Sequence, residues 1–316
     1  MLYLTEDDVH ALLPMSAALE VVRSVLTDSG AGRAPVLPRR RVRASGAVLA
    51  VMAAAWNPEG GPSVLGSKVY AAGRAGAHFH VLLWRGEDGQ PLAMIEANRL
   101  GQVRTGAATG VATDVLANRK SARLFVIGTG YQAETQVEAV AAVRALERVT
   151  VYGRDPSRRE AFAARMAERL GLSVRPVEAP ERAAAEADVV VTVTNAQEPV
   201  LLGRWLRPGT HVNAAGSNRD DHAEIDPEAV ERAAVVAVDD LAGARLEAGD
   251  LVRAAAAGWS WDRAVALGDI LRGTRPGRPD AAAITLFESQ GIASEDVAAA
   301  AYVYAAARRE GRGREI

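Results

Sequence analysis

The sequence predicts an α/β fold in which a Rossmann-type, doubly wound parallel sheet is inserted into an α+β domain. From residue 123 to 239, short apolar segments alternate with helical segments, as in parallel sheets covered by helices on both faces. From residue 35 to 96, β-prone runs follow one another with glycine-containing turns between them, which indicates an antiparallel sheet. A chain of 316 residues is long enough for about two domains.

The N-terminal segment predicts two helices. Thr5 and Asp8 have the spacing of a capping box, in which each side chain accepts a hydrogen bond from the other residue's backbone N–H. A second helix is expected over 16–29, because its apolar residues recur at helical spacing and Gly30 follows as a stop signal.

The elements expected after these helices are the following. The antiparallel region has strands over 36–42, 48–54, 66–70, 80–84 and 92–97, and a helix over 102–117 follows it. The alternating region has strands over 123–128, 148–153, 173–177, 189–194, 211–215 and 234–239, with helices over 133–146, 158–170 and 180–187. An alanine-rich helix is expected over 293–309.

Composition excludes several classes of function. The chain has no cysteine, which rules out disulfides, cysteine–zinc sites and thiol nucleophiles. A net charge of −2 gives no positive field for nucleic acid, so no nucleic-acid partner is expected. The apolar runs are shorter than the roughly 18 residues of a membrane span, and the acidic start does not match a secretory signal. We therefore expect a cytoplasmic protein without a membrane partner, and the five scattered histidines predict no metal site.

Lysine is rare in this chain. Of its 37 basic residues, only Lys68 and Lys120 are lysine, and the excess of arginine is most simply a coding bias. Lys68 lies in the apolar stretch 64–70, which favours a functional role over a lysine that extends its ammonium group to the surface.

A glycine loop lies between a predicted strand and a predicted helix. Gly128 allows a tight turn, Gly130 lets the backbone approach a pyrophosphate, and Ala133 permits close packing of the helix on the strand. The helix N-terminus adds N–H groups for the phosphates. The alternative is a tight turn without a ligand. A dinucleotide cofactor is therefore expected on Gly128, Thr129, Gly130, Tyr131 and Gln132.

The end of the next strand bears on the choice between NAD and NADP. An acidic residue there would bind the ribose diol of NAD, but the sequence has Gly153, followed by Arg154, Asp155 and Arg158. Arginines suit a 2′-phosphate, so NADP is favoured over NAD. Asp155 could instead bind the ribose, or it could be a turn residue before Pro156.

Taken in order, several motifs resemble the ornithine cyclodeaminase/mu-crystallin family along essentially the whole chain. They are Leu4-Thr5, Gly66-Ser67-Lys68, Arg104-Thr105, the glycine loop, Gly216-Ser217-Asn218 with Glu224-Ile225-Asp226, Pro276-Gly277-Arg278 and the segment from Phe287 to Asp296. The resemblance implies a homodimer. It also implies a substrate-binding and dimerisation domain over 1–118 plus 290–316, and an NAD(P)-binding Rossmann domain over 119–289.

The resemblance also implies roles for individual residues. Lys68 resembles the active-site lysine that contacts the substrate, and either Arg39 or Arg41 resembles the residue that binds the substrate carboxylate. Arginines on a β-prone strand could instead be edge charges that discourage aggregation. The remaining implied positions are Arg104 and Thr105 for the cofactor phosphates, Arg104 and Gln290 for the substrate, Thr194, Ala214 and Ser289 for the nicotinamide side of the cofactor, and Asn195 for the cofactor without a stated part.

One position departs from the cyclodeaminase pattern. Where those enzymes have an aspartate that acts as acid and base on the amine, this chain has Asn218. An amide forms hydrogen bonds but does not accept and return a proton near neutral pH, so the acid–base step lacks its group. Asp220 or Asp221 could take that role, or both could be turn residues.

If the cyclisation step is left out, the family's chemistry that the resemblance implies is hydride transfer. We expect an NAD(P)H-dependent oxidoreductase that acts on the α-carbon of an amino acid or imino acid. Its activity would resemble that of a ketimine reductase, a pyrroline-2-carboxylate reductase or an alanine dehydrogenase. One alternative is an ornithine or lysine cyclodeaminase, a lyase that recycles NAD. Another is a crystallin-like protein that binds NADPH and a small ligand.

Overall fold

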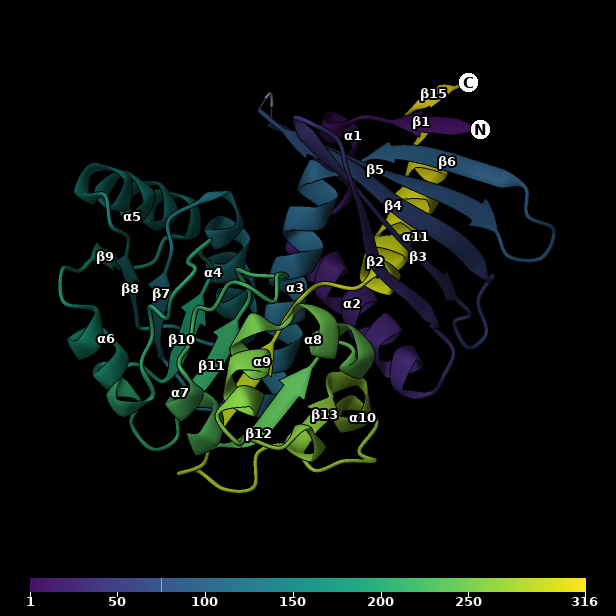
Figure 1. The fold of residues 1–316 in the computed structure, drawn as a ribbon. Coiled ribbons are helices and arrows are strands. Elements are labelled where there is room, and N and C mark those ends of the chain that lie inside the picture. The colour runs from purple at the N-terminus through teal and green to yellow at the C-terminus, as the bar shows by residue number, and fades with distance from the viewer. Residues whose placement is uncertain (75) are drawn as a thin grey trace. The chain divides into compact units, whose positions relative to one another are not determined.

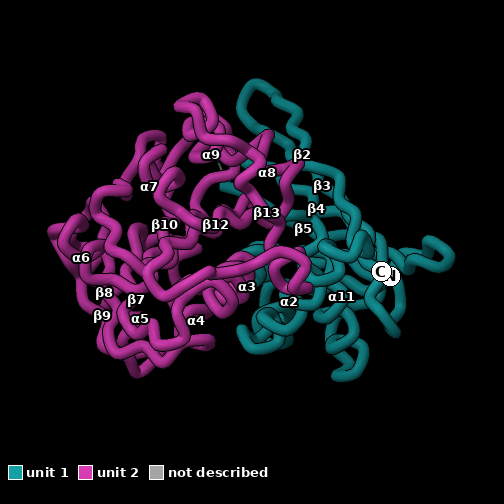
Figure 2. Tube along the Cα trace, turned by 90° about the horizontal axis from the view of Figure 1, so that it is seen from below, with its two compact units in different colours: residues 1–104, 291–316 teal, residues 105–290 magenta. Residues whose placement is uncertain are grey.

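The computed structural model describes residues 1–74 and 76–316, which form two compact units. Unit 1 comprises Met1–Arg104 and Gly291–Ile316, and unit 2 comprises Thr105–Gln290 (Figure 2). The chain passes from unit 1 to unit 2 inside helix α3 (Asn98–Leu116), whereas the sequence places the boundary after residue 118. Residues 105–116 of α3 belong to unit 2, and Arg144 of the same unit donates hydrogen bonds to the carbonyl oxygens of Thr113, Asp114 and Ala117.

Unit 1 contains a mainly antiparallel sheet, as the sequence predicts. Its strands follow the order β15 (Arg314–Glu315), β1 (Leu2–Leu4), β6 (Pro91–Glu96), β5 (Gly76–Arg85), β4 (Val64–Gly73), β3 (Ala47–Trp56) and β2 (Val36–Arg43). Strands β2 to β6 pair antiparallel with their neighbours in chain order. The short β1 is not predicted by the sequence; it pairs parallel with β6 and antiparallel with β15.

Three helices belong wholly to unit 1: α1 (Glu6–Leu12), α2 (Met15–Gly30) and α11 (Ala293–Glu310). The capping box of Thr5 and Asp8 at the start of α1 is confirmed. Helix α11 packs across β2 to β6 and against α2 (Figure 1). It lies close to the backbone of β4 at Gly66, where an added Cβ would lie 2.6 Å from Val297 Cγ2. Glycine is therefore required at this contact between helix and sheet.

Unit 2 confirms the predicted doubly wound parallel fold. Its eight strands are all parallel and follow the order β13 (Ala264–Ala266), β12 (Ala233–Val238), β14 (Ile284–Glu288), β11 (His211–Ala214), β10 (Val189–Thr192), β7 (Arg123–Ile127), β8 (Arg148–Tyr152) and β9 (Val174–Pro176). Strands β13 and β14 are not predicted by the sequence. Strand β13 has three residues, and β14 follows the Pro- and Gly-containing stretch 276–283, which has the composition of a loop.

Helices cover both faces of this sheet. They are α4 (Tyr131–Val143), α5 (Pro156–Leu170), α6 (Pro180–Glu186), α7 (Pro227–Arg232), α8 (Leu241–Glu247), α9 (Gly249–Ala256) and α10 (Leu267–Leu271), with short 3₁₀ helices at Gly203–Trp205 and Trp261–Arg263. Along β7, alternate residues enter different cores: Leu124 and Val126 pack with α4 and α5, and Phe125 and Ile127 pack in the core on the other side. Burial on both faces explains the unbroken apolar strands.

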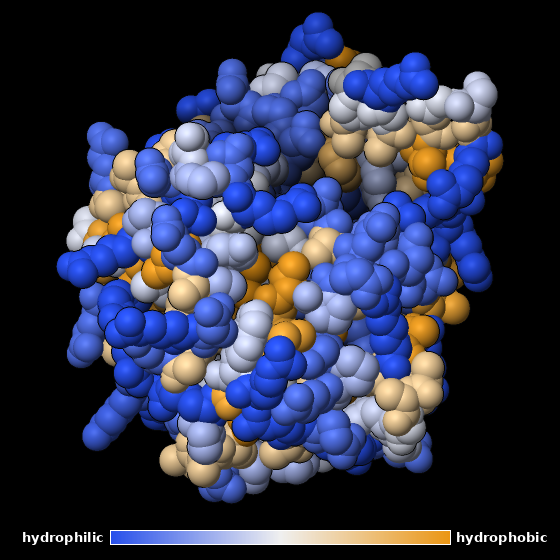
Figure 3. All heavy atoms as spheres, turned by 60° about the vertical axis from the view of Figure 1, so that its left-hand side comes forward, coloured by the Kyte–Doolittle hydropathy of each residue, from blue (hydrophilic) through white to orange (hydrophobic). Residues whose placement is uncertain are grey.

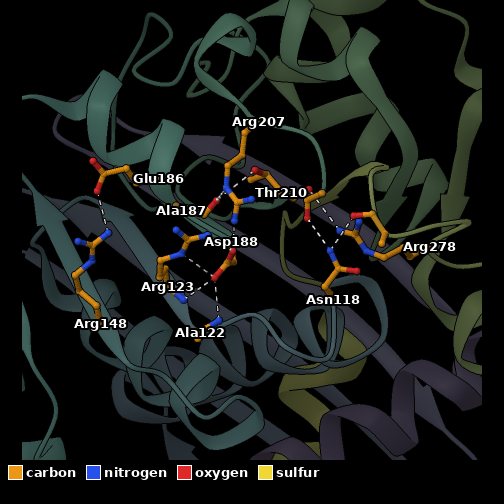
Figure 4. Close-up of polar contacts among 12 residues, drawn as sticks. Asn118, Ala122, Arg123, Arg148, Glu186, Ala187, Asp188, Arg207, Thr210 and Arg278 are labelled. Carbon is orange, nitrogen blue, oxygen red and sulfur yellow. Dashed lines mark hydrogen bonds and ion pairs between the residues drawn. The ribbon is translucent and has the colours of Figure 1, made fainter.

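A polar network stabilises the N-terminal end of this sheet. Asp188, just before β10, accepts hydrogen bonds from the backbone N–H groups of Ala122 and Arg123 and from the side chains of Arg123 and Arg207 (Figure 4). These groups lie at the opposite end of β7 from the glycine loop. We therefore assign them a structural role.

Hydrophobic character is limited both on the face drawn in Figure 3 and in the helices of residues 1–74 and 76–316. On the face drawn in Figure 3, hydrophilic residues cover most of the surface and hydrophobic residues form small groups. Among residues 1–74 and 76–316, no single helix is long and apolar enough to cross a bilayer. Only α1 and α2 taken together reach that length and composition, and they are bent by 87° at their junction.

Candidate active site

The glycine loop of unit 2 has the geometry of a phosphate cradle. Gly128 has φ +123°, and an added Cβ would lie 2.4 Å from the Val193 carbonyl oxygen, so only glycine fits there. A Cβ at Gly130, by contrast, would meet no atom within 4 Å. Gly130 precedes α4, and no side chain caps that helix. Helix N-termini of this kind are favourable places for an anion. The residues present therefore fit the pyrophosphate of a dinucleotide.

The loop after β8 contains the residues expected to distinguish the two cofactors. Asp155 is the N-cap of α5, and its side chain accepts a hydrogen bond from the backbone N–H of Arg158 at 3.1 Å. An added Cβ at Gly153 would lie 2.8 Å from Thr129 Oγ1, so a larger residue there would displace Thr129. The side chains of Arg154 and Arg158 are exposed.

Glu224 joins two loops at the C-terminal ends of β10 and β11. Its buried carboxylate accepts hydrogen bonds from the backbone N–H of Thr194 at 2.5 Å and of Gly216 at 2.7 Å. It also accepts from the hydroxyl groups of Thr192 and Thr194. Burial and the neighbouring Asp250 raise the pKa of Glu224 to about 7, although the hydrogen bonds from Thr194 and Gly216 oppose this shift. Glu224 belongs to one of the family motifs, but the sequence predicts no role for it.

A second buried group surrounds the end of β14. Gln290 donates its backbone N–H to Asp239 and its side-chain amide to Glu288, each at 3.0 Å. Burial, followed by the charges of Asp250, Glu224 and Asp239, raises the pKa of Glu288 well above its usual range. Ser289 donates its backbone N–H to the carbonyl of Ala214. Its buried hydroxyl has no hydrogen-bond partner among the described residues, so it is available to a ligand.

The loop after β11 contains the position of the missing cyclodeaminase aspartate. Asn218 lies in this loop, between Ser217 and Arg219. Asp221 forms a two-point ion pair with Arg219 and contacts His222 Nδ1 at 2.8 Å. These partners hold the pKa of Asp221 well below its usual range, so it does not supply a proton near neutral pH. The geometry thus gives Asp221 a structural role in the loop.

Unit 1 brings three of the predicted substrate residues into one buried cluster. Lys68 Nζ lies 2.8 Å from Asp296 Oδ1, and Arg104 Nε donates to the same oxygen at 3.0 Å. Arg104 Nη1 donates to Glu295 at 2.9 Å. Arg39 donates to the Gly291 carbonyl at 3.1 Å. Because these five side chains comprise three cations and two carboxylates, their formal net charge is +1, which suits one substrate carboxylate.

Burial and charge together set the protonation of this cluster. Burial lowers the pKa of Lys68 to about 8; Asp296 opposes the shift, while Arg104 and Arg39 add to it. Burial also disfavours charged Asp296, but Arg104 and Lys68 outweigh that effect and hold its pKa below the usual value. Lys68 therefore exchanges a proton close to physiological pH, unlike an exposed lysine.

Arg39 and Arg41 differ in their surroundings. Arg39 is buried and 8% exposed, whereas Arg41 is only partly buried. A register shift in the pairing of β2 with β3 falls between Leu37 and Arg40, next to Arg39. An irregularity of this kind redirects side chains. The burial of Arg39 beside Lys68 and Arg104 favours it as the carboxylate ligand.

Glu295 and Asp296 were not predicted as site residues. They lie in the first turn of α11, where acidic residues ordinarily compensate the partial positive charge of a helix N-terminus. Both are fully buried, which the sequence alone does not reveal. Thr105 is the first residue of unit 2 and follows Arg104 directly. Asn195 is exposed and lies in the loop after β10.

A doubly wound sheet with this glycine loop defines a dinucleotide-binding protein. The chain belongs to the ornithine cyclodeaminase/mu-crystallin family, whose model matches residues 2–311. The predicted resemblance is therefore confirmed.

Named relatives show how similar the chain is to known proteins. It is 39% identical to a Bacillus cereus Δ1-pyrroline-2-carboxylate reductase over 238 residues, which are 75% of this chain and 73% of that one. A solved Δ1-pyrroline-2-carboxylate reductase from Thermococcus litoralis, in complex with NADH and L-proline, aligns over 100% of both chains at 31% identity and a TM-score of 0.93. A dimeric archaeal alanine dehydrogenase with bound NAD aligns at 30% identity and a TM-score of 0.93, over 100% of this chain and 98% of that one.

Proposed function

We propose that this protein is an NAD(P)H-dependent reductase of α-imino acids, related in activity to pyrroline-2-carboxylate reductase and alanine dehydrogenase. The observation that carries the proposal is the buried cluster of unit 1, in which Arg39, Lys68 and Arg104 exceed two carboxylates by one positive charge. A buried excess of positive charge attracts an anionic group, and the carboxylate of an imino acid is such a group. The names and bound molecules of the relatives support the same substrate class.

The residues of each unit have separate tasks in this proposal. The nicotinamide, when bound to unit 2, supplies a hydride for the α-carbon of the imine. Arg39 and Arg104 bind and orient the α-carboxylate. Lys68 Nζ donates a proton to the imine nitrogen, which becomes the amine nitrogen. The chain's own contribution is therefore orientation and proton transfer.

The cofactor preference proposed here is NADPH. Its support is the absence of an acidic residue at Gly153, the use of the Asp155 carboxylate as a helix cap, and the exposed side chains of Arg154 and Arg158. A 2′-phosphate would be matched by these arginines. A cytoplasmic location likewise stays a prediction from the sequence.

A homodimer is also proposed, and the uncovered face of the unit 1 sheet supports it. Opposite the face covered by α11, this sheet exposes Leu37, Val42, Leu49, Val51 and Leu65. Contiguous exposed apolar residues mark interaction surfaces, and the solved archaeal relative is a dimer. We expect sedimentation equilibrium to give twice the chain mass of 33.3 kDa; a monomer at micromolar concentration would contradict this proposal.

A substrate panel tests the proposed activity. Purified protein should oxidise NADPH with 1-pyrroline-2-carboxylate, 1-piperideine-2-carboxylate, or pyruvate plus ammonia, and absorbance of the reduced nicotinamide reports the reaction. The same panel with NADH decides the cofactor preference. If no imino or oxo acid consumes reduced cofactor while ornithine releases ammonia, the protein is a cyclodeaminase instead. If NADPH binds but nothing turns over, it is a binding protein.

The two neighbouring arginines provide a matched pair for testing carboxylate binding. Arg39→Ala is expected to raise KM for the imino acid by about 10- to 100-fold, the effect of losing a hydrogen bond to a charged group of about 1.5–3 kcal/mol. Arg41→Ala is expected to change KM less than about threefold. Steady-state kinetics at saturating NADPH measure both. A larger KM effect for Arg41→Ala than for Arg39→Ala would reverse the assignment.

A further inference from the structure

We propose that Asp296 is the positioning residue for Lys68: it fixes the ammonium group in one place and keeps it charged until a proton is transferred. This inference rests on the proposed reductase function. It assigns a role to a residue at the start of α11 that the sequence analysis left without one.

The geometry makes Asp296 the shared anchor of two cations. Its Oδ1 atom is 2.8 Å from Lys68 Nζ and 3.0 Å from Arg104 Nε, and its side chain is fully buried. Oδ2 is also buried and has no hydrogen-bond partner among residues 1–74 and 76–316. The carboxylate therefore has one oxygen committed to Lys68 and Arg104 and a second oxygen free for a polar group of the substrate.

Gly101 and Phe79 lie beside the ammonium group of Lys68. An added Cβ at Gly101 would lie 3.0 Å from Lys68 Nζ, so glycine in α3 leaves room for the ammonium group. On another side, the Phe79 ring centroid lies 5.4 Å from Nζ, which is within reach of a cation–π interaction. Asp296 supplies the oppositely charged contact that completes this site.

The charges that act on Lys68 come from three elements. Arg104 on α3 and Arg39 on β2 repel its positive charge, and Asp296 on α11 attracts it. Glu295, next in the chain to Asp296, contacts Arg104 instead of Lys68. Without Asp296, burial and the two arginines would favour the neutral amine, which does not act as an acid near neutral pH.

Lys68 supplies the proton that the reduction of the imine requires. Hydride from the nicotinamide forms the new C–H bond at the α-carbon as the C=N π bond breaks. The nitrogen takes a proton from Lys68 Nζ, and the reduced cofactor becomes oxidised. Neutral Lys68 then recovers a proton from water, and the Asp296 carboxylate favours that recovery.

The scarcity of lysine makes the test direct. Protein labelled with [ε-¹³C]lysine has two lysine signals, from Lys68 and Lys120, and Lys120→Arg assigns them. Titration of the Lys68 signal is expected near the pKa of about 8 in the unaltered protein. In Asp296→Asn the pKa of Lys68 is expected to fall by about 1–3 units, the usual effect of a close opposite charge. Glu295→Gln is the matched control and is expected to shift it by less than about half a unit, since Glu295 does not contact Lys68.

The pH dependence of kcat/KM should change in the same way as the titration of Lys68. The basic limb of the pH profile of kcat/KM should move to lower pH in Asp296→Asn by the same shift and stay in place in Glu295→Gln. Asp296→Glu, which retains the charge, should restore the limb and provides a second variant if the amide variant does not fold. An unchanged Lys68 titration, or a shifted titration with an unchanged kinetic limb, overturns the proposal. Failure of the reductase function is distinguishable, because the titration requires no substrate.

Discussion

Replacing Lys68 by methionine is expected to lower kcat/KM for imino-acid reduction by about 10²- to 10⁴-fold, the range typical of a lost general acid. Methionine retains most of the side-chain volume but cannot donate a proton. NADPH affinity should stay within about threefold of the unaltered protein, because the glycine loop belongs to unit 2 and Lys68 to unit 1. Steady-state kinetics and calorimetric NADPH binding measure the two effects separately.

The second lysine of the chain provides the control. Lys120 is exposed, and Lys120→Met should leave kcat/KM unchanged. In the unaltered protein, kcat/KM should be level below pH 8 and fall about tenfold per pH unit above it, because Lys68 with a pKa of about 8 must be protonated to act as an acid. More than about a tenth of the original kcat/KM in Lys68→Met would rule out proton donation by Lys68.

Replacing Glu224 by alanine is expected to lower the free energy of unfolding of unit 2 by about 3–5 kcal/mol. The buried carboxylate accepts hydrogen bonds from two backbone N–H groups and two hydroxyl groups. Alanine leaves these donors without their partner inside the protein. The loops at Thr194 and Gly216 would separate, so NADPH affinity should fall as well.

A carboxylate on α7 serves as the comparison. Glu228 has a side chain that is 48% exposed and lies 4.0 Å from Arg232, which is a surface ion pair. Glu228→Ala should change the free energy of unfolding by less than about 0.5 kcal/mol. Differential scanning calorimetry of the two variants measures the difference. Equal stability of Glu224→Ala and Glu228→Ala would show that the carboxylate does not stabilise these loops.

The parts of the fold that were predictable depend on local pattern. The capping box at Thr5, the glycine loop and the alternation of strands and helices are each determined by neighbouring residues, and the structure confirms them. Strand β14 was missed because it follows the loop-like stretch 276–283, and its place between β11 and β12 is seen only from its pairing with both. Such non-local pairing is not visible in a short segment.

The residues of the candidate site were also predictable only in part. Lys68 stood out because lysine is rare, and the resemblance supplied Arg39, Arg41 and Arg104. Lys68 and Asp296, which form an ion pair, are 228 positions apart in the chain, and no local pattern encodes such a contact. The fully buried acids on α11 look like ordinary residues of a helix start until their environment is known.

The division of unit 1 into two chain segments has a consequence for how the protein is made. Unit 2 is one continuous segment, whereas strands β1 to β6 of unit 1 are synthesised before unit 2, and strand β15 and the covering helix α11 after it. On the ribosome, the first hundred residues must therefore wait, with the apolar face of their sheet uncovered, while the second unit emerges and folds. Newly synthesised chains are most exposed to aggregation during this interval, and chaperones that bind apolar strands would act on residues 36–96 at that stage.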